Sequence, residues 1–147
     1  MVISMKISTK GRYALRMMID LAEHQEEGYI SLKDIAERQG ISKKYLEQIV
    51  TMLNKSDFLQ VNRGFQGGYK LAFPPERYTV GDILRVTEGS LAPVACLDGD
   101  PSECTRSSFC VTLPIWKGLD RVINEYLDGI TLRDILESER EGYDYSI

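Results

Sequence analysis

Several features that would assign a chemical function are scarce in this sequence. It has one histidine and three cysteines in 147 residues. With so little histidine and no nucleophile beside a base at a recognisable spacing, the requirements of an active site are not met, and we expect no enzyme. The longest uncharged run is the ten residues 107–116, well short of the roughly 18 apolar residues of a membrane-spanning helix. We therefore expect no membrane partner.

The first residues also lack the features of an export signal. Met1 to Lys6 contain no basic region followed by an apolar and a small-residue region. We therefore expect a cytoplasmic protein, in which three cysteines do not form a disulfide framework. The length and the 43% apolar content fit one compact domain, or one small domain with a dimerising extension.

Charge is divided unevenly along the chain. The net charge is −4, but residues 1–77 hold 12 Lys and Arg against 9 Asp and Glu, whereas residues 78–147 hold 6 against 13. The front part is therefore basic and the rest is acidic. This division permits DNA binding by the front part without requiring it, because solvated helices also mix charges in this way.

The front part predicts three helices. The first is capped by Ser8 or Thr9 and runs to about His24, and the second follows Ser31 and stops at Gly40. The third, capped by Ser42, has apolar residues spaced i, i+3, i+4 and i+7: Leu46, Ile49, Val50 and Leu53. The same period puts polar residues on its opposite face: Lys44, Glu47, Gln48 and Thr51. Two short helices with a glycine turn predict a helix-turn-helix, whose second helix normally enters the DNA major groove.

A hairpin follows these helices. Residues 58–62 and 69–71 predict two strands joined by the glycine-rich turn 63–68. The predicted fold is therefore mainly α with a small β-hairpin, a winged helix-turn-helix. Arg63 at the base of the wing either enters the minor groove or only keeps the hairpin hydrated. The glycines after it leave room for a close approach to DNA, although they also suit a simple turn.

The second half predicts a helix over 79–88, a loop over 90–112 and a long helix that begins at Pro114 and ends at Gly129. Its apolar residues form one stripe: Ile115, Trp116, Leu119, Val122, Ile123, Tyr126 and Leu127. We favour a seam with a second copy over core packing, because helix-turn-helix proteins usually bind pseudo-palindromic double-stranded DNA as two-fold homodimers. The expected division is a winged domain (5–89), a cysteine-bearing sensor loop (90–112), a dimerisation helix with a short helix from Thr131 (113–137) and a polar tail (138–147).

All three cysteines lie in that loop, as Cys96, Cys104 and Cys110. Their clustering indicates a metal or redox site, since core cysteines would be spread over the helices. The spacing does not suit zinc, whereas an iron-sulfur cluster tolerates it but needs a fourth ligand. The candidates are a carboxylate, a group from another helix or subunit, or an exogenous ligand; the carboxylates are Asp98, Asp100 and Glu103, and the only histidine, His24, is distant in sequence. Spacing alone leaves a disulfide-forming thiol switch equally open.

Nearly the whole chain resembles the Rrf2-type bacterial transcriptional regulators. The resemblance rests on residues 5–14 (MKISTKGRYA), 35–42 (IAERQGIS) and 45–48 (YLEQ), and on Arg63-Gly64 followed by Gly67-Gly68-Tyr69. It implies a sequence-specific DNA-binding regulator, of the repressor kind, in which Arg63 enters the minor groove and one set of third-helix residues faces DNA: Lys44, Tyr45, Glu47 and Gln48. Lys43, Thr51 and Gly64 complete the expected DNA-binding set. Gln48 suits adenine and Glu47 a cytosine amine, whereas Lys44 is assigned to phosphate.

The resemblance also implies that Cys96, Cys104 and Cys110 hold an iron-sulfur cluster, for which we favour [2Fe-2S] over [4Fe-4S]. The chain departs from the family at two positions. Leu113 stands where the regulators of cluster biogenesis have a histidine, and Arg12 stands where the nitric-oxide sensors have an acidic residue, so the fourth ligand is unassigned. The alternatives are a cluster-free regulator controlled by thiol oxidation or a protein partner, and a winged helix that serves only protein contacts. An iron-sulfur electron carrier would have no use for the wing.

Overall fold

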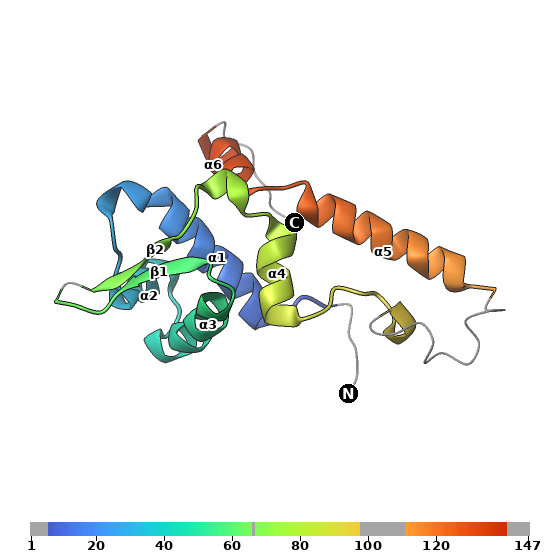
Figure 1. Cartoon of the computed structure of the whole chain (residues 1–147), viewed down its shortest axis with the longest axis horizontal. Coiled ribbons are helices and arrows are strands. Elements are labelled where there is room, and N and C mark those ends of the chain that lie inside the picture. Colours follow the sequence, from blue (N-terminus) through green and yellow to red (C-terminus); the bar gives the residue numbers. More distant parts are fainter. Residues whose placement is uncertain (1–5, 66, 98–110, 141–147) are drawn as a thin grey trace.

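The computed structural model describes residues 6–65, 67–97 and 111–140. A winged helix-turn-helix and one long projecting helix lie along a common axis, with the wing at one end and the projecting helix at the other (Figure 1). The predicted fold class is confirmed. Among the described residues, no helix is both long and apolar enough to cross a bilayer.

The front part begins with α1 (Thr9–Glu23), and the helix-turn-helix that follows consists of α2 (Leu32–Gln39) and α3 (Lys43–Lys55). Each begins at the serine expected from the sequence, because the hydroxyls of Ser8, Ser31 and Ser42 accept hydrogen bonds from backbone N–H groups of the first turn. Gly40 ends α2 in the left-handed conformation, with φ 65°, which glycine adopts without strain. The short 3₁₀ helix η1 (Gln25–Glu27) leads out of α1.

The wing is an antiparallel pair, β1 (Leu59–Asn62) and β2 (Gly68–Leu71), with Leu59 opposite Leu71 and Asn62 opposite Gly68. On its other side β2 pairs with Ile30, whose backbone exchanges two hydrogen bonds with Tyr69, of 2.9 and 2.8 Å. The hairpin is therefore tied to the segment that leads into α2. This bridge fixes the wing relative to the helix-turn-helix.

The core lies between α1, α3 and α4 (Val80–Glu88), which follows the 3₁₀ helix η2 (Pro75–Arg77). The expected capping box is present, since Thr79 and Asp82 satisfy each other's backbone N–H groups. Most of the largest fully buried apolar side chains come from α1, α2, α3 and α4 and their connections: Met17, Met18, Leu21, Ile35, Leu46, Ile49, Leu53, Tyr78 and Ile83. Each expected helix of the front part therefore contributes its apolar face to one core.

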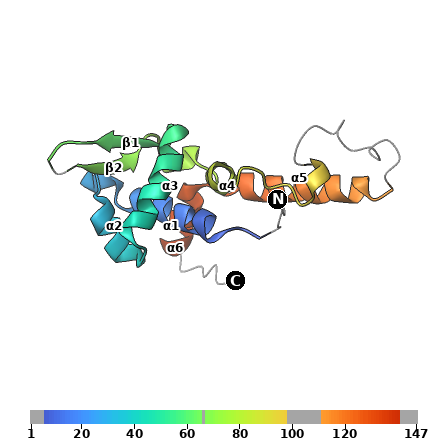
Figure 2. The ribbon, with the colours of Figure 1, turned by 90° about the horizontal axis from the view of Figure 1, so that it is seen from below.

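The second half contains η3 (Ala95–Leu97), α5 (Leu113–Asp128) and α6 (Leu132–Arg140). Helix α5 extends away from the winged domain, whereas α6 turns back and packs against α1 (Figures 1 and 2). Leu132 of α6 is fully buried. The last helix therefore contributes to the core of the winged domain and continues to Arg140, past the expected end at Glu137.

Candidate nucleic-acid interface

Helix α3 presents a polar face to solvent, as its periodicity predicts. Leu46, Ile49, Val50 and Leu53 are buried, whereas the polar residues predicted to contact DNA are exposed: Lys43, Lys44, Glu47, Gln48 and Thr51. The first turn contains two lysines and no acidic residue. Because a helix N-terminus carries partial positive charge, lysines there disfavour the helix and favour a bound anion. The start of α3 therefore suits phosphate.

A groove of about 620 Å³ separates α3 from the wing. It is lined from the α2 side by Ser31, Leu32 and Lys33, from α3 by Lys43, Glu47, Val50, Thr51 and Asn54, and from the wing by Val61, Asn62, Arg63, Gly67, Gly68 and Tyr69. Three cationic side chains and one carboxylate line it. We call this feature the α3–wing groove.

The structure brings four of the predicted DNA-binding residues to this groove, namely Lys43, Glu47, Thr51 and Arg63. Lys44 and Gln48 are exposed on α3 but do not line it. Tyr45 is half-buried and packs edge-on against Tyr13 of α1, with ring centroids 5.6 Å apart. Gly64 is exposed in the wing loop, where its N–H donates to Asn62 Oδ1 at 3.1 Å. The predicted set therefore spans the groove and the adjoining face of α3.

The wing needs glycine at two positions because backbone atoms approach closely. A Cβ on Gly68 would lie 2.4 Å from the carbonyl oxygen of Ile30, and one on Gly67 would lie 2.3 Å from that of Asn62. Neither contact involves a side chain that could move aside. The two glycines therefore maintain the bridge to Ile30 and the tight end of the hairpin, beyond any role in approaching DNA.

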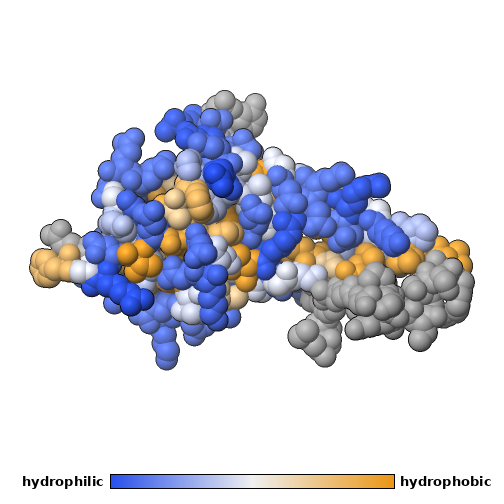
Figure 3. All heavy atoms as spheres, in the orientation of Figure 1, coloured by the Kyte–Doolittle hydropathy of each residue, from blue (hydrophilic) through white to orange (hydrophobic). Residues whose placement is uncertain are grey.

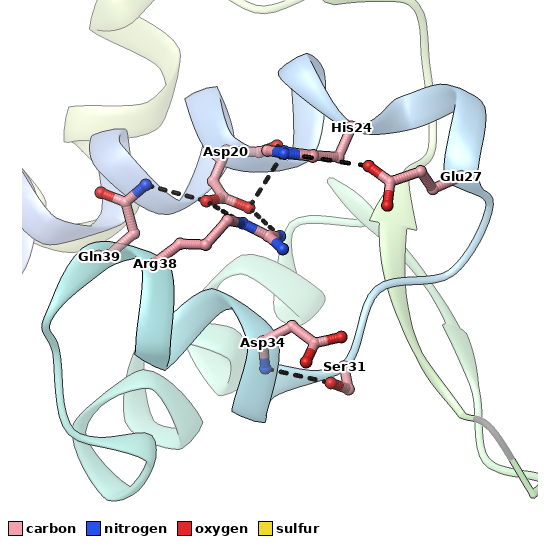
Figure 4. Close-up of polar contacts among 7 residues, drawn as sticks. All are labelled: Asp20, His24, Glu27, Ser31, Asp34, Arg38 and Gln39. Atoms are coloured by element: carbon pink, nitrogen blue, oxygen red, sulfur yellow. Dashed lines mark hydrogen bonds and ion pairs between the residues drawn. The ribbon is translucent and has the colours of Figure 1, made fainter.

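A buried carboxylate sets the position of the helix-turn-helix on α1 (Figure 4). Asp20 is 1% exposed, and its two oxygens accept hydrogen bonds from Arg38 at 2.7 and 3.0 Å and one from Gln39 at 2.9 Å. His24 Nδ1 lies 2.8 Å from the carbonyl oxygen of Asp20. Arg16 of α1 also contacts the end of α2, through a hydrogen bond of 3.1 Å to the side chain of Gln39. These contacts attach the turn before α3 to α1.

The same contacts keep Asp20 ionised. Burial by itself raises the pKa of the Asp20 carboxyl, but the hydrogen bonds from Arg38 and Gln39 and the charge of Arg38 outweigh burial and hold the pKa below its usual value. The bidentate geometry is the strongest form of an arginine–carboxylate contact. The orientation of α2 therefore depends on a charged pair as well as on apolar packing.

Three residues of this region were missed by the sequence reasoning. Lys33 and Asn54 line the α3–wing groove, and Asp20 organises the turn behind it. Lys33 had a signal, because it lies in the first turn of α2, where a lysine opposes the helix dipole. Asp20 had one as well, as a carboxylate between Met17 and Leu21 on an apolar helix. Asn54 had none.

The described residues cover the apolar stripe of α5 only in part, since Trp116, Leu119, Ile123 and Leu127 are half-buried and the other three stripe residues are exposed. No residue of α5, which is described over its whole length, is buried, and Ile115, Val122 and Tyr126 are 61%, 56% and 63% exposed. Figure 3 shows the resulting apolar band along the projecting helix. Packing against the described part of the winged domain therefore does not account for the exposed residues of the stripe. We call it the α5 stripe.

One arginine attaches α5 to α4. Arg85 donates to both carboxylate oxygens of Asp128, at 2.7 and 2.9 Å, and to Asn124 Oδ1 at 2.6 Å. The hydrogen bonds from Arg85 hold the pKa of Asp128 below its usual value. The helices approach so closely that a Cβ on Gly81 would lie 2.1 Å from Asp128 Oδ1. The C-terminal end of α5 is therefore fixed to the winged domain.

Of the three cysteines, only Cys96 is among the described residues. It lies in η3, is half-buried and is a free thiol. Cys104, Cys110 and the carboxylates proposed as fourth ligand, Asp98, Asp100 and Glu103, lie outside the described residues. Within the described residues, no three histidine, cysteine or acidic side chains are grouped as a metal site. Leu113 is the first residue of α5, and Arg12 is exposed on α1.

Comparison with known proteins extends these observations. The family model described as "Rrf2: Iron-dependent Transcriptional regulator" matches residues 7–138. Protein rrf2 of Nitratidesulfovibrio vulgaris is 40% identical over 132 residues, which cover 90% of this chain and 87% of that protein. Among solved structures, T. potens IscR has a TM-score of 0.74 at 42% identity and covers 97% of this chain and 93% of its own.

A second solved structure is CymR, the global cysteine regulator of B. subtilis, with a TM-score of 0.72 at 42% identity. That similarity covers 88% of this chain and 95% of CymR. The family match includes α5 and most of α6. The similarities are therefore not confined to the helix-turn-helix.

Proposed function

Because the chain belongs to the Rrf2 family of DNA-binding helix-turn-helix transcriptional regulators, we propose that it acts as a two-fold homodimer on a pseudo-palindromic operator. In this proposal it is a regulator rather than an enzyme, and it works in the cytoplasm, where bacterial DNA lies. In each half-site α3 occupies the major groove and the wing the adjacent minor groove. The α3–wing groove is the observation that carries this proposal.

The α3–wing groove suits the sugar-phosphate ridge that separates the two DNA grooves. Lys33, Lys43 and Arg63 line it from three different elements, and phosphate contacts of this kind fix the register of a protein on the duplex. Glu47 in the same groove repels phosphate, which suits a role at a cytosine amine. Gln48 on the adjoining face of α3 is free to pair with adenine, and Arg63 at the edge of the wing reaches into the minor groove.

The α5 stripe is the dimer interface of this proposal. An isologous contact between two copies of the stripe covers the exposed side chains of Ile115, Val122 and Tyr126. Because Arg85 fixes one end of each α5 to its winged domain, the angle between paired helices sets the separation of the two recognition helices. The chain is proposed to divide as the sequence predicts, into a winged domain (5–89), a cysteine-bearing sensor loop (90–112), a dimerisation helix with a short helix (113–137) and a polar tail (138–147). Helix α6 also contributes to the core of the winged domain.

The effector of this proposal acts through the cysteines between α4 and α5. Three thiolates are a donor set that suits an iron-sulfur cluster, and the matched family model is described as iron-dependent. Cys96, Cys104 and Cys110 would hold the cluster, with the fourth ligand unassigned, and the group would supply a redox-sensitive change of local charge. Cys96 is a half-buried free thiol, which is compatible with such a ligand.

The test is an operator selection followed by point variants. The wild-type protein is used to select duplexes from a random-sequence library, and binding is titrated at several salt concentrations. Gln48→Ala and Arg63→Ala are expected to weaken specific binding, and loss of a bidentate base contact costs about 1–3 kcal/mol and relaxes one operator position. Lys43→Gln is expected to reduce the salt dependence by about one phosphate contact. Lys55→Gln, at the other end of α3, is the matched control.

The proposal fails if the wild type selects no sequence, or if affinity is indifferent to salt. Unchanged sequence preference in both the Gln48 and the Arg63 variant would remove these residues from the interface while leaving the function standing. A folded dimer must be demonstrated for each variant by circular dichroism and light scattering. Loss of binding is then attributable to the contact.

A further inference from the structure

One side chain at the tip of the wing has no place in the contacts described so far. Phe65 is 98% exposed, more than any other large apolar side chain among the described residues. It lies two residues after Arg63, on the loop between β1 and β2. A phenylalanine kept almost wholly in water contributes nothing to the core, and it has apolar surface to bury against a partner.

The loop presents Phe65 on a constrained backbone. The side chain of Asn62 accepts from the N–H of Gly64 at 3.1 Å, and Asn62 pairs with Gly68 across the hairpin. Gly67 packs so tightly that a Cβ there would touch the carbonyls of Asn62 and Gly64, at 2.3 and 2.7 Å. These contacts hold the backbone at Gly64 and at Gly67, on the two sides of Phe65, and Gly64 adds no side chain that would shield the ring.

The surroundings of Phe65 favour DNA as the partner. Arg63 and Gly67, on either side of it, line the α3–wing groove together with Lys33 and Lys43. The tip is thus continuous with a surface whose cations suit phosphate. It lies at the end of the molecule opposite to the projecting helix α5 (Figures 1 and 3). A dimer formed through the α5 stripe therefore leaves it uncovered.

We infer that Phe65 inserts as an apolar wedge between two base pairs in the minor groove that Arg63 enters. This inference rests on the proposed function. Wedge residues partly unstack a base step and bend the duplex toward the major groove. Pyrimidine–purine steps such as TA unstack most easily, whereas A-tracts are stiff. Phe65 therefore adds a preference for a flexible step at an operator position where no hydrogen bond is made to a base.

The experiment uses the operator selected by the wild-type protein. Protection mapping first locates the base step that lies against the wing. One series of duplexes carries TA or AA at that step, and another series carries 2-aminopurine there. A third is labelled at its ends for energy transfer, which reports bending. The wild type is expected to bind the TA duplex about tenfold more tightly than the AA duplex, to raise the 2-aminopurine fluorescence and to bring the duplex ends closer.

Phe65→Ala is expected to remain a folded, salt-sensitive DNA-binding dimer that has lost the step preference, the fluorescence rise and the bend. Phe65→Leu retains an apolar wedge and is expected to keep most of all three. Tyr29→Ala removes an aromatic side chain that is also exposed, near β2 but away from the tip, and is expected to behave as wild type.

The outcomes separate this inference from the function on which it rests. If Phe65→Ala matches the wild type in all three measurements, or loses affinity without changing the fluorescence and the bend, Phe65 does not insert and the wedge is wrong. If the wild type selects no operator at all, the proposed function itself fails. Loss of the three signals in Phe65→Ala, with rescue by leucine, supports the wedge.

Discussion

At the scale of single residues, Asp20 stands apart as the one buried charged side chain in residues 6–65, 67–97 and 111–140. Its partner Arg38 is about one-third exposed, with a side-chain accessibility of 34%. Removing the carboxylate charge therefore leaves a guanidinium that water can still reach. The cost is smaller than that of breaking a wholly buried pair.

Asp20→Asn keeps the shape of the side chain and removes its charge. We expect a loss of about 1.5–3 kcal/mol in the free energy of unfolding at pH 7, the range of hydrogen bonds to charged groups. Because folding lowers the pKa of Asp20, the stabilisation is present above about pH 4 and disappears as the pH falls through the folded-state value. Urea titrations at several pH values measure the difference in free energy of unfolding between the wild type and the variant. Asp57→Asn, at an exposed position, should show no such difference.

The carboxyl group of Glu23 has a raised pKa in the folded protein, whereas the pKa of Asp20 is lowered. The pKa of Glu23 is raised to about 7, by burial, by a hydrogen bond with Glu139 and by the negative charges of Glu139 and Asp20, against a smaller effect of His24. Glu23 and Glu139 lie on α1 and α6 and line a groove that also contains Glu26, Arg133 and Arg140. Two carboxyl groups from α1 and α6 therefore face the same groove, and protonation of Glu23 relieves their repulsion.

Glu23→Gln should remove this pH dependence. In the wild type the folded state favours the protonated form, so stability falls as the pH rises from about 4.5 to about 7 and is constant above that. Thermal unfolding is expected to show equal stability of variant and wild type near pH 4 and a more stable variant at pH 8. Glu26→Gln, in the same groove, is the control. A constant difference across this range would contradict the raised pKa of Glu23.

At the scale of helices and strands, most boundaries could be predicted because local chemistry fixes them. Ser8, Ser31, Ser42 and Thr79 accept from the first turns that they precede, and Gly40 stops α2 in a conformation that suits glycine. The end of α6 could not be predicted from its polar sequence. Packing of α6 against α1 and η2 orders this helix, and such packing depends on residues far apart in the chain.

The candidate DNA-binding site could also be predicted only in part. Periodicity on α3 separated its exposed polar face from its buried one, and the glycines located the wing. The groove between them has a different origin, since Lys33 and Arg63 meet there only because Ile30 pairs with β2. The contacts of Asp20 with Arg38 and Gln39 likewise join elements that no local pattern relates.

The α5 stripe carries a prediction that belongs to the helix as a unit. Val122→Glu places a charge in the middle of the proposed dimer interface, and we expect monomers at micromolar concentration. DNA affinity should fall with it, by about a hundredfold or more, because the second half-site no longer binds as part of one molecule. Light scattering and operator titration measure the two effects.

Lys117→Glu alters charge more strongly at an exposed position of α5 outside the stripe, and it should leave the dimer intact. A wild-type protein that is monomeric at micromolar concentration would show that the stripe has another use. A Val122 variant that stays dimeric would place the interface elsewhere on the molecule.

At the scale of the whole molecule, the proposed sensor cysteines lie in a connection from which the angle of the proposed dimer could be altered. The cysteines follow α4, which ends at Glu88, and precede α5, which begins at Leu113. Arg85 holds the other end of α5 to α4. In the proposed dimer, an effector bound to the cysteines would therefore act on one end of a helix whose other end is fixed, and a small rotation would decide whether both recognition helices reach half-sites at a set spacing.

The cysteines should therefore act together. We expect Cys96→Ala, Cys104→Ala and Cys110→Ala to give one phenotype, a colourless protein after anaerobic iron-sulfur reconstitution with the same shift in operator affinity, whereas Val111→Ala should match the wild type. A tenfold shift requires about 1.4 kcal/mol of coupling between effector and DNA. Absorption spectra, iron and sulfide analysis and operator titration provide the measurements. Three different phenotypes would indicate a thiol switch that uses two of the sulfurs, and a wild type that takes up no iron and ignores oxidants would show that the segment senses neither.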